Sequence, residues 1–502
     1  MLSLGGAVVS AVASFLLIVV VTRMFDKETA GFLFSTTSLF VMAEALCALG
    51  TATGMVYFIA RYRALEAGGA VRSIIAMALP VVVTTATVVA VALFFAAPWI
   101  AAQMNAGEPA AEAGRFLRVL VAFLPLAVAY DVCIAASQGF HTMNPTVVLE
   151  KVSRPVVQLV GMSVAGLLGA AWLLPVAWAG PYLLGAVIVA VWLRRLVRAD
   201  VDRGDGSAGP TRRAFWSYTA PRGVASAAQL SLQRLDVVLV AVMLGAAPAA
   251  LYTAATRFVV VGQLGSQAVA LAVQPKYAEL LAHDDREATK RVYRTTTAWV
   301  MAVTWPIHLV VAVCAPVILK VFGPGYDSAW AVTVILALAM LFATSCGMVT
   351  MLLVMAGKTS WNLINVVVAL VTNVVLNLAL IPVWGINGAA VAWAAALVIS
   401  NALPLFQVRR LLGIDPFGRG SPIVAALAVV CFAVIPGSVW LFGASLWILV
   451  GLAAIGTVLY ALGIWRLRAA LGLDEFVEAM RDRRLRKART APARADYPDG
   501  HE

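Results

Sequence analysis

The sequence is a long series of apolar runs of about 20 residues, separated by short charged or glycine- and proline-rich breaks. A helix rises about 1.5 Å per residue, so a run of this length crosses the roughly 30 Å hydrocarbon core of a bilayer. Lipid offers no hydrogen-bond partners, and a helix makes its backbone hydrogen bonds within itself, so these runs are expected to be helical. Only 12% of the residues are charged, against about a quarter in soluble domains. We therefore predict an all-α polytopic membrane protein.

The runs predict about fourteen transmembrane helices. The first has no basic residue before it, so it is predicted to be a transmembrane helix and not a cleaved signal peptide. The predicted helices lie near residues 3–22, 30–58, 73–97, 115–138, 151–170, 174–193, 217–243, 248–273, 294–319, 329–356, 360–381, 387–408, 421–440 and 444–465.

Lysine and arginine are concentrated in alternate loops. Residues 61–72, 194–213, 276–294 and 408–420 and the tail are basic, whereas loops such as 244–253 and 381–388 contain no Lys or Arg. The positive-inside rule places the basic loops and both termini in the cytoplasm. The intervening outer loops are too short to hold a folded catalytic or receptor domain.

The chain also contains an internal repeat. A shift of about 219 residues aligns residues 24–39 with 243–258, and nearly the same shift aligns residues 136–144 with 354–362. Two parallel six-helix lobes around a central cavity are therefore predicted. The lobes are 1–198 and 217–412, with a cytoplasmic linker at 199–216, two further helices within 413–465 and a cytoplasmic tail at 466–502.

Cofactor chemistry finds no support in the sequence. The five cysteines lie in or beside apolar runs without a CxxC pair, the four histidines have no metal-binding spacing, and no Walker motif is present. We predict neither a metal nor a cofactor. The net charge is +12. We interpret the basic residues as setting the orientation in the membrane and contacting lipid headgroups, and we predict no nucleic-acid partner.

Several segments resemble the polysaccharide-unit flippases of the multidrug/oligosaccharidyl-lipid/polysaccharide exporter superfamily. They are residues 4–39, residues 235–258, and a block near 321–395 that contains FGPGY, AGK, an asparagine-rich helix, LIP and GINGAA in order. The resemblance covers about residues 1–415, and the fourteen-helix count agrees with it.

The resemblance implies a non-enzymatic transporter in the bacterial cytoplasmic membrane. Its substrate would be an undecaprenyl-pyrophosphate-linked glycan, moved from the inner to the outer leaflet by alternating access. Membrane lipids are expected partners, together with a polysaccharide polymerase and glycosyltransferases. Coupling to a proton or sodium gradient or to the membrane potential is a further expectation.

Two arginines are predicted near the bilayer midplane. Arg234 lies about ten residues inside the outer end of the seventh helix, and Arg257 about nine inside that of the eighth. Both are therefore roughly 14–15 Å deep. Guanidiniums at one depth can bind a diphosphate bidentately. Asp236 is two residues from Arg234, so the two side chains point in different directions.

Other polar residues in the helices are predicted to line the cavity or to bond neighbouring helices. Arg222 and Gln229 share a face with Asp236, with Gln233 nearby, and Asn373 lies on an asparagine-rich face. Asp236, Glu44 and Asp131 are candidates for ion coupling or for interhelical hydrogen bonds. Arg154 is among the arginines near cytoplasmic helix ends. Membrane orientation and contact with lipid headgroups explain these arginines, and contact of one or two of them with an incoming pyrophosphate stays open.

Three alternatives stay open at this point. A cation-coupled multidrug exporter would favour an acidic, aromatic cavity, whereas this chain also offers the two buried arginines. A lipid-linked peptidoglycan-precursor flippase shares the mechanism and is poorly separated by sequence. A membrane polymerase or glycosyltransferase would need a larger aqueous loop or a carboxylate cluster.

Overall fold

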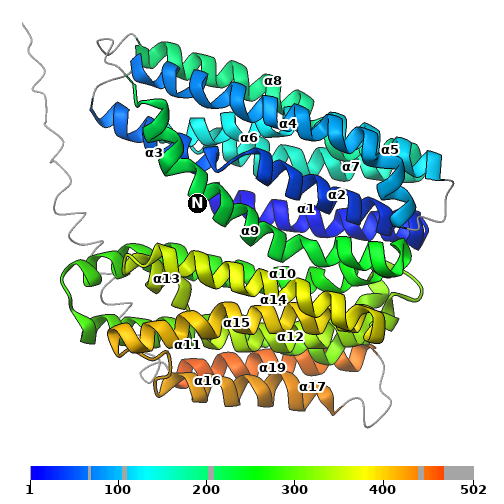
Figure 1. The fold of residues 1–502 in the computed structure, drawn as a ribbon. Coiled ribbons are helices and arrows are strands. Elements are labelled where there is room, and N and C mark those ends of the chain that lie inside the picture. The colour runs from blue at the N-terminus through cyan, green and yellow to red at the C-terminus, as the bar shows by residue number, and fades with distance from the viewer. Residues whose placement is uncertain (1, 66–68, 105–109, 202–208, 439–445, 468–502) are drawn as a thin grey trace, which may run out of the picture. The chain divides into compact units, whose positions relative to one another are not determined.

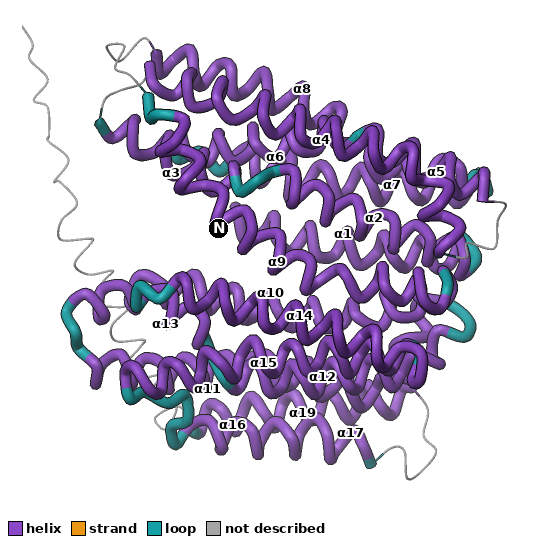
Figure 2. Tube along the Cα trace, in the orientation of Figure 1, coloured by secondary structure: helices purple, strands orange, loops and turns teal. Residues whose placement is uncertain are grey.

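The computed structural model describes residues 2–65, 69–104, 110–201, 209–438 and 446–467, and this part of the chain is helical without strands (Figures 1 and 2). Eleven helical segments in these ranges are long and apolar enough to cross a membrane. The other three predicted helices, near 151–170, 248–273 and 444–465, overlap helices of the described ranges. The all-α polytopic prediction is confirmed, and fourteen helices are compatible with the structure. Most of the predicted cytoplasmic tail lies outside the described residues.

The chain divides into two compact units. The first consists of residues 1–261, 314–340 and 358–403, and the second of residues 262–313, 341–357 and 404–502. The two six-helix lobes stay a prediction.

The N-terminal part of the first unit holds most of the elements that form the candidate site. In this part α2 packs on α9, α1 on α7, α6 on α8, and α7 on α8. Its helices are α1 (Leu2–Met24), α2 (Lys27–Cys47), α3 (Thr51–Ala64), α4 (Gly69–Gln103), α5 (Ala110–Ala122), α6 (Leu124–Gly139), the π-helix η1 (Thr146–Ser153), α7 (Arg154–Leu167), η2 (Ala171–Leu173), α8 (Leu174–Val201) and α9 (Arg212–Leu244).

The remaining elements follow in chain order. In the first unit, α9 also packs against α14. In the second unit, α16 and α17 pack against α19. The elements are α10 (Ala246–Ala282), α11 (Arg286–Ile318), η3 (Leu319–Phe322), η4 (Tyr326–Ala329), α12 (Trp330–Ser345), α13 (Val349–Met355), α14 (Thr359–Trp384), α15 (Ile386–Leu412), α16 (Gly420–Val429), η5 (Val430–Val434), α17 (Ile435–Gly437) and α19 (Leu446–Arg466).

Three predicted helices are interrupted. The run at 30–58 breaks into α2 and α3 at Leu49 and Gly50, which have φ angles of 48° and 74°. The run at 329–356 breaks at Gly347, with a φ of 61°, and the run at 115–138 breaks between α5 and α6 beside Pro125. Apolar periodicity continues through these positions, so the run lengths alone did not reveal the breaks.

The FGPGY motif forms a turn that is fixed to α1. The guanidinium of Arg23 donates from Nε to the Val321 carbonyl at 2.8 Å and from Nη2 to the Lys320 carbonyl at 2.9 Å. Gly323 and Gly325 have φ angles of 124° and 76°, a region that glycine adopts without steric cost. Arg23 of α1 therefore satisfies two carbonyls in the 3₁₀-helical segment that leads into the motif.

Helix α9 crosses the α2–α3 break at backbone contact distance. A Cβ atom added to Gly223 would lie 2.5 Å from the carbonyl carbon of Leu49 and 2.7 Å from the amide nitrogen of Gly50. A Cβ atom on Gly54 would lie 2.5 Å from Thr219 Oγ1. Small residues permit this close approach, as is common where membrane helices pack.

We therefore expect Gly223→Ala to lower the thermal stability of the purified protein. Overpacking costs about 1–3 kcal/mol, which exceeds the gain of about 1 kcal/mol from replacing a helical glycine with alanine. Gly5→Ala is the matched control, because a Cβ atom there meets nothing within 4 Å. If both variants unfold at the same temperature in detergent, the close crossing is not a packing constraint.

Candidate functional site

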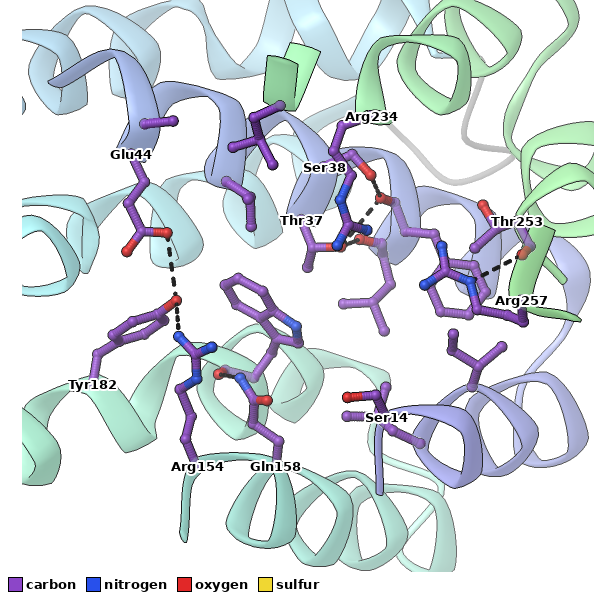
Figure 3. Close-up of a pocket in the computed structure, with 18 of the residues that line it drawn as sticks. Ser14, Thr37, Ser38, Glu44, Arg154, Gln158, Tyr182, Arg234, Thr253 and Arg257 are labelled. Atoms are coloured by element: carbon purple, nitrogen blue, oxygen red, sulfur yellow. Dashed lines mark hydrogen bonds between the residues drawn. The ribbon is translucent and has the colours of Figure 1, made fainter. Parts of the chain in front are cut away.

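A cavity of about 350 Å³ lies within the first unit and is lined by residues of α1, α2, α6, η1, α7, α8, α9 and α10. Its two ends differ in chemistry (Figure 3). We call the part around Arg234 and Arg257 the basic end. The acidic end is formed by Glu44, Asp131, Glu150, Arg154 and Tyr182.

The basic end brings together the two arginines that the sequence placed at one depth. Helices α9 and α10 meet at Gly245, eleven residues after Arg234 and twelve before Arg257. Both guanidiniums line the cavity. Arg257 donates from Nε to the Thr253 carbonyl at 3.2 Å. Among the described residues, neither guanidinium has a carboxylate within 4 Å. Two positive charges therefore face one cavity without a carboxylate partner in the part of the chain that the structure describes.

Hydroxyl groups accompany these charges. Ser14, Thr37, Ser38 and Thr253 all line the cavity. The side chains of Thr37 and Ser38 donate to carbonyls of their own helix, as serine and threonine commonly do in membrane helices. Thr253 Oγ1 is buried without a hydrogen-bond partner. The basic end thus has hydroxyl groups in addition to its arginines.

A network of side chains from several helices builds the acidic end. Arg154 pairs with Glu150 at 2.5 Å and donates from Nη1 to the Tyr182 hydroxyl at 2.8 Å. That hydroxyl donates to Glu44 Oε2 at 3.5 Å (Figure 3). Glu44 is 6% exposed, and its Oε1 atom is buried without a partner. Asp131 lines the same end.

Sequence reasoning missed Arg154 as a cavity residue. It begins α7 immediately after the π-helix η1, and side-chain pairing holds it in the cavity lining. π-Helical turns are frequent at functional sites. The available signal was the spacing of Glu150 and Arg154, four residues apart, which suits an ion pair on one helix face. Trp178 and Tyr182, also four apart, were missed as well.

Asp236 lies outside the cavity lining, in a buried polar cluster. It is 2% exposed, accepts from the Tyr252 hydroxyl at 3.1 Å and accepts from Asn377 Nδ2 at 2.8 Å. Asn373 lies one helical turn before Asn377, and its side-chain oxygen and nitrogen are buried without partners. Asp236 is therefore not the ion-pair partner of Arg234.

The other predicted residues are also placed away from the cavity lining. Gln229 and Gln233 are exposed on α9. The Arg222 guanidinium covers the ring of Tyr218, 3.7 Å from its centroid, and donates to the Tyr218 carbonyl at 2.9 Å. Seven-residue spacing puts Arg222, Gln229 and Asp236 on one face, but that face meets different surroundings along α9.

The sequence matches a family profile described as "Polysaccharide biosynthesis protein" over residues 1–281 and one described as "MatE" over residues 221–379. The chain belongs to the polysaccharide biosynthesis protein family. This family lies within the multidrug/oligosaccharidyl-lipid/polysaccharide exporter superfamily that the sequence resembles. No curated protein matches the chain in sequence.

Solved structures of this superfamily share the fold. A structure titled "Lipid II flippase MurJ, inward closed conformation" is 13% identical, with a TM-score of 0.71, and the alignment covers 92% of this chain and 98% of that chain. An inward-facing multidrug resistance MATE family transporter is 16% identical, with a TM-score of 0.66 and coverage of 81% and 95%. A superfamily transporter from Pyrococcus furiosus is 15% identical, with a TM-score of 0.58 and coverage of 82% and 94%.

This membership makes the chain a multi-pass membrane transporter of the flippase type. The predicted family and fold are thereby confirmed. The transported substrate is a separate question, which depends on the chemistry of the cavity.

Proposed function

We propose that the protein flips a polyprenyl-diphosphate-linked oligosaccharide from the cytoplasmic to the outer leaflet of a bacterial cytoplasmic membrane. The single observation that carries this proposal is the pair Arg234 and Arg257, which face one cavity without a carboxylate partner among the described residues. An arginine at the centre of a membrane helix costs about 2.5–3.5 kcal/mol. A diphosphate would offset that cost by supplying the missing negative charge.

The geometry of arginine suits this ligand. A guanidinium presents a rigid fork of N–H donors that matches two oxygens of a phosphate group. Two such forks on neighbouring helices can address both phosphates of a diphosphate. The hydroxyls of Thr37, Ser38 and Thr253 add polar groups beside them.

The cavity volume limits how much of the substrate is enclosed. About 350 Å³ is at the lower end of the range for ligand pockets. In this conformation the cavity would hold the diphosphate and the sugar nearest to it. The polyprenyl chain would remain in lipid, because its apolar surface is more stable there than in water. Such a carrier moves the glycan without forming or breaking a bond, so we propose that it is not an enzyme.

Asp236 is our proposed coupling group. A buried carboxylate is stable only when it is paired, coordinated or protonated. Its observed partners, Tyr252 and Asn377, are neutral. A proton or a sodium ion would neutralise it, and the neighbouring amide oxygens of Asn373 and Asn377, both without hydrogen-bond partners, are suitable sodium ligands. The ion gradient would then bias the transport cycle.

The basic loops support an orientation in the membrane, and the family resemblance supports the partners. We propose that both termini and the basic loops lie in the cytoplasm. A polyprenyl glycosyltransferase must supply the lipid-linked glycan, and a polysaccharide polymerase would use it after flipping. A lipid-linked peptidoglycan precursor carries the same diphosphate and is the closest alternative substrate.

A multidrug exporter is the second candidate, favoured by the three carboxylates and the Tyr182 ring of the acidic end and by Trp178, which also lines the cavity. Binding to purified protein separates the two functions. We expect undecaprenyl diphosphate to bind and to be displaced by excess inorganic diphosphate, because the arginines recognise its charge. We expect tetraphenylphosphonium, an organic cation, to compete poorly. Tight binding of the cation together with no binding of undecaprenyl diphosphate would favour the exporter.

A further inference from the structure

The FGPGY motif at residues 322–326 has no part in the diphosphate site. It connects η3 to η4, between α11 and α12. In the proposed orientation this connection lies on the outer side of the membrane, as do the α1–α2 and α9–α10 connections. A flippase needs an exit toward the outer leaflet, so the contacts among these connections bear directly on transport.

The cavity lies close beneath three of these outer helix ends. Ile18 of α1 lines it five residues before Arg23. Leu33 lines it six residues after the start of α2, and Thr253 lines it seven residues after the start of α10. At 1.5 Å per residue these separations are about 7–11 Å. A path from the cavity toward the outer leaflet would therefore lead between these helix ends.

Direct packing closes that path in this conformation. A Cβ atom added to Gly31 of α2 would lie 1.7 Å from the carbonyl oxygen of Ala246 of α10, so the two backbones are in contact. Phe15 of α1, Phe258 of α10 and Phe322 of the motif form a triangle with ring centroids 5.6–5.7 Å apart. Phe322 is fully buried. The first residue of the motif therefore packs against both α1 and α10.

Arg23 and Lys27 hold the motif through contacts that water can replace. The two hydrogen bonds of the Arg23 guanidinium end on backbone carbonyls of η3 and are exposed. The Lys27 ammonium lies 5.6 Å from the ring centroid of Tyr326, the last residue of the motif. Exposed contacts of these kinds contribute little net free energy, because water satisfies the same groups when they separate. They are therefore suited to repeated opening and closing.

We propose that the FGPGY motif is a releasable latch that closes the cavity on its outer side, with Arg23 as the residue that holds it on α1. When the latch is engaged, Phe322 fills the space between α1 and α10. When Arg23 releases the η3 carbonyls, Phe322 withdraws and the outer ends of α1 and α10 can separate. This inference rests on the proposed function and adds the element that controls access from the outer side.

Labelling of a cavity cysteine from the outer side tests the latch without any substrate. Ser14→Cys supplies the reporter, because Ser14 lines the cavity and has an exposed side chain, whereas all five natural cysteines are buried. A membrane-impermeant maleimide is added to intact spheroplasts, so that it meets the protein only from outside. We expect Arg23→Gln to raise the labelling rate of the reporter about tenfold. Arg23→Lys keeps the charge but lacks the planar fork, so it should raise the rate less.

Arg118→Gln is the matched control. Arg118 also donates from Nε to a backbone carbonyl, that of Phe94 at 3.2 Å, but it joins α5 to α4 and not α1 to the motif. Equal labelling of the reporter with and without Arg23→Gln would overturn the latch. An equal rise with Arg118→Gln would overturn it as well, because the effect would then be a general loosening of the fold.

Unfolding is detected with Arg23→Gln in the protein without the reporter, where only the natural cysteines can react. If they do react, the comparison rests on Arg23→Lys, and a labelling rate equal to that of the reporter alone would overturn the latch. The proposed function is judged separately. Outward labelling that depends on Arg23 in a protein that binds no undecaprenyl diphosphate would support the latch and overturn the proposed substrate.

Discussion

Replacing both Arg234 and Arg257 with alanine is expected to weaken the binding of undecaprenyl diphosphate by about 100-fold or more. Hydrogen bonds to charged groups contribute about 1.5–3 kcal/mol each, and about 1.4 kcal/mol corresponds to a factor of ten. Removing both guanidiniums takes away the positive charges that form the basic end of the cavity. Equilibrium binding of a fluorescent undecaprenyl diphosphate to the purified variants measures this loss.

Arginine-to-lysine variants refine the same experiment. Lysine keeps the charge but lacks the planar fork, so we expect Arg234→Lys and Arg257→Lys to bind with intermediate affinity. Arg195→Ala is the matched control, because Arg195 is exposed on α8 and lies outside the cavity lining. Wild-type affinity in the folded double alanine variant would show that the two arginines do not hold the substrate.

Replacing Asp236 with asparagine is expected to remove the effect of an ion gradient on transport. Asparagine has nearly the same shape and can retain hydrogen bonds with Tyr252 and Asn377, so the packing of α9 should persist. It cannot take up a proton and carries no charge to attract sodium. We expect proton or sodium gradients to accelerate flipping by wild type at least about tenfold, which corresponds to a free-energy difference of about 1.4 kcal/mol. The same gradients should leave the flipping rate of Asp236→Asn unchanged.

The comparison uses proteoliposomes with defined pH and sodium on each side. Asp284→Asn is the control, because the Asp284 side chain is 81% exposed. If Asp236→Asn responds to the gradient as wild type does, the coupling group lies elsewhere. Glu44 and Asp131, the other two acids proposed from the sequence, would then be the next to test.

The sequence was sufficient to predict that the two arginines lie at one level of consecutive helices, and both line the same cavity. Helices α9 and α10 are joined by a short turn at Gly245, so counting residues from that turn gives the level of each side chain. The separation of Arg234 from Asp236 follows equally from helix geometry, because residues two apart point to different sides. The structure accordingly places Arg234 in the cavity and Asp236 in a buried cluster.

The acidic end could not be assembled in this way. Glu150 and Arg154 are four residues apart, but Glu44 and Tyr182 come from helices that are distant from them in the sequence, and only tertiary packing brings the three parts together. For Arg222, Gln229 and Asp236, in contrast, the sequence predicted a shared helix face correctly but did not reveal what that face contacts. A helix of 33 residues extends about 50 Å, so a single face passes from exposed surface to a buried contact with α14.

The proposed function is tested by following the movement of a lipid-linked glycan across a bilayer. Proteoliposomes would contain an undecaprenyl-diphosphate disaccharide with a fluorophore on its sugar, and a membrane-impermeant reductant would be added outside. We expect wild type to expose label from both leaflets to the reductant, whereas vesicles with the Arg234→Ala and Arg257→Ala double variant should lose only outer-leaflet label, as protein-free vesicles do. Wild-type protein of confirmed thermal stability that leaves the inner-leaflet label protected would contradict it.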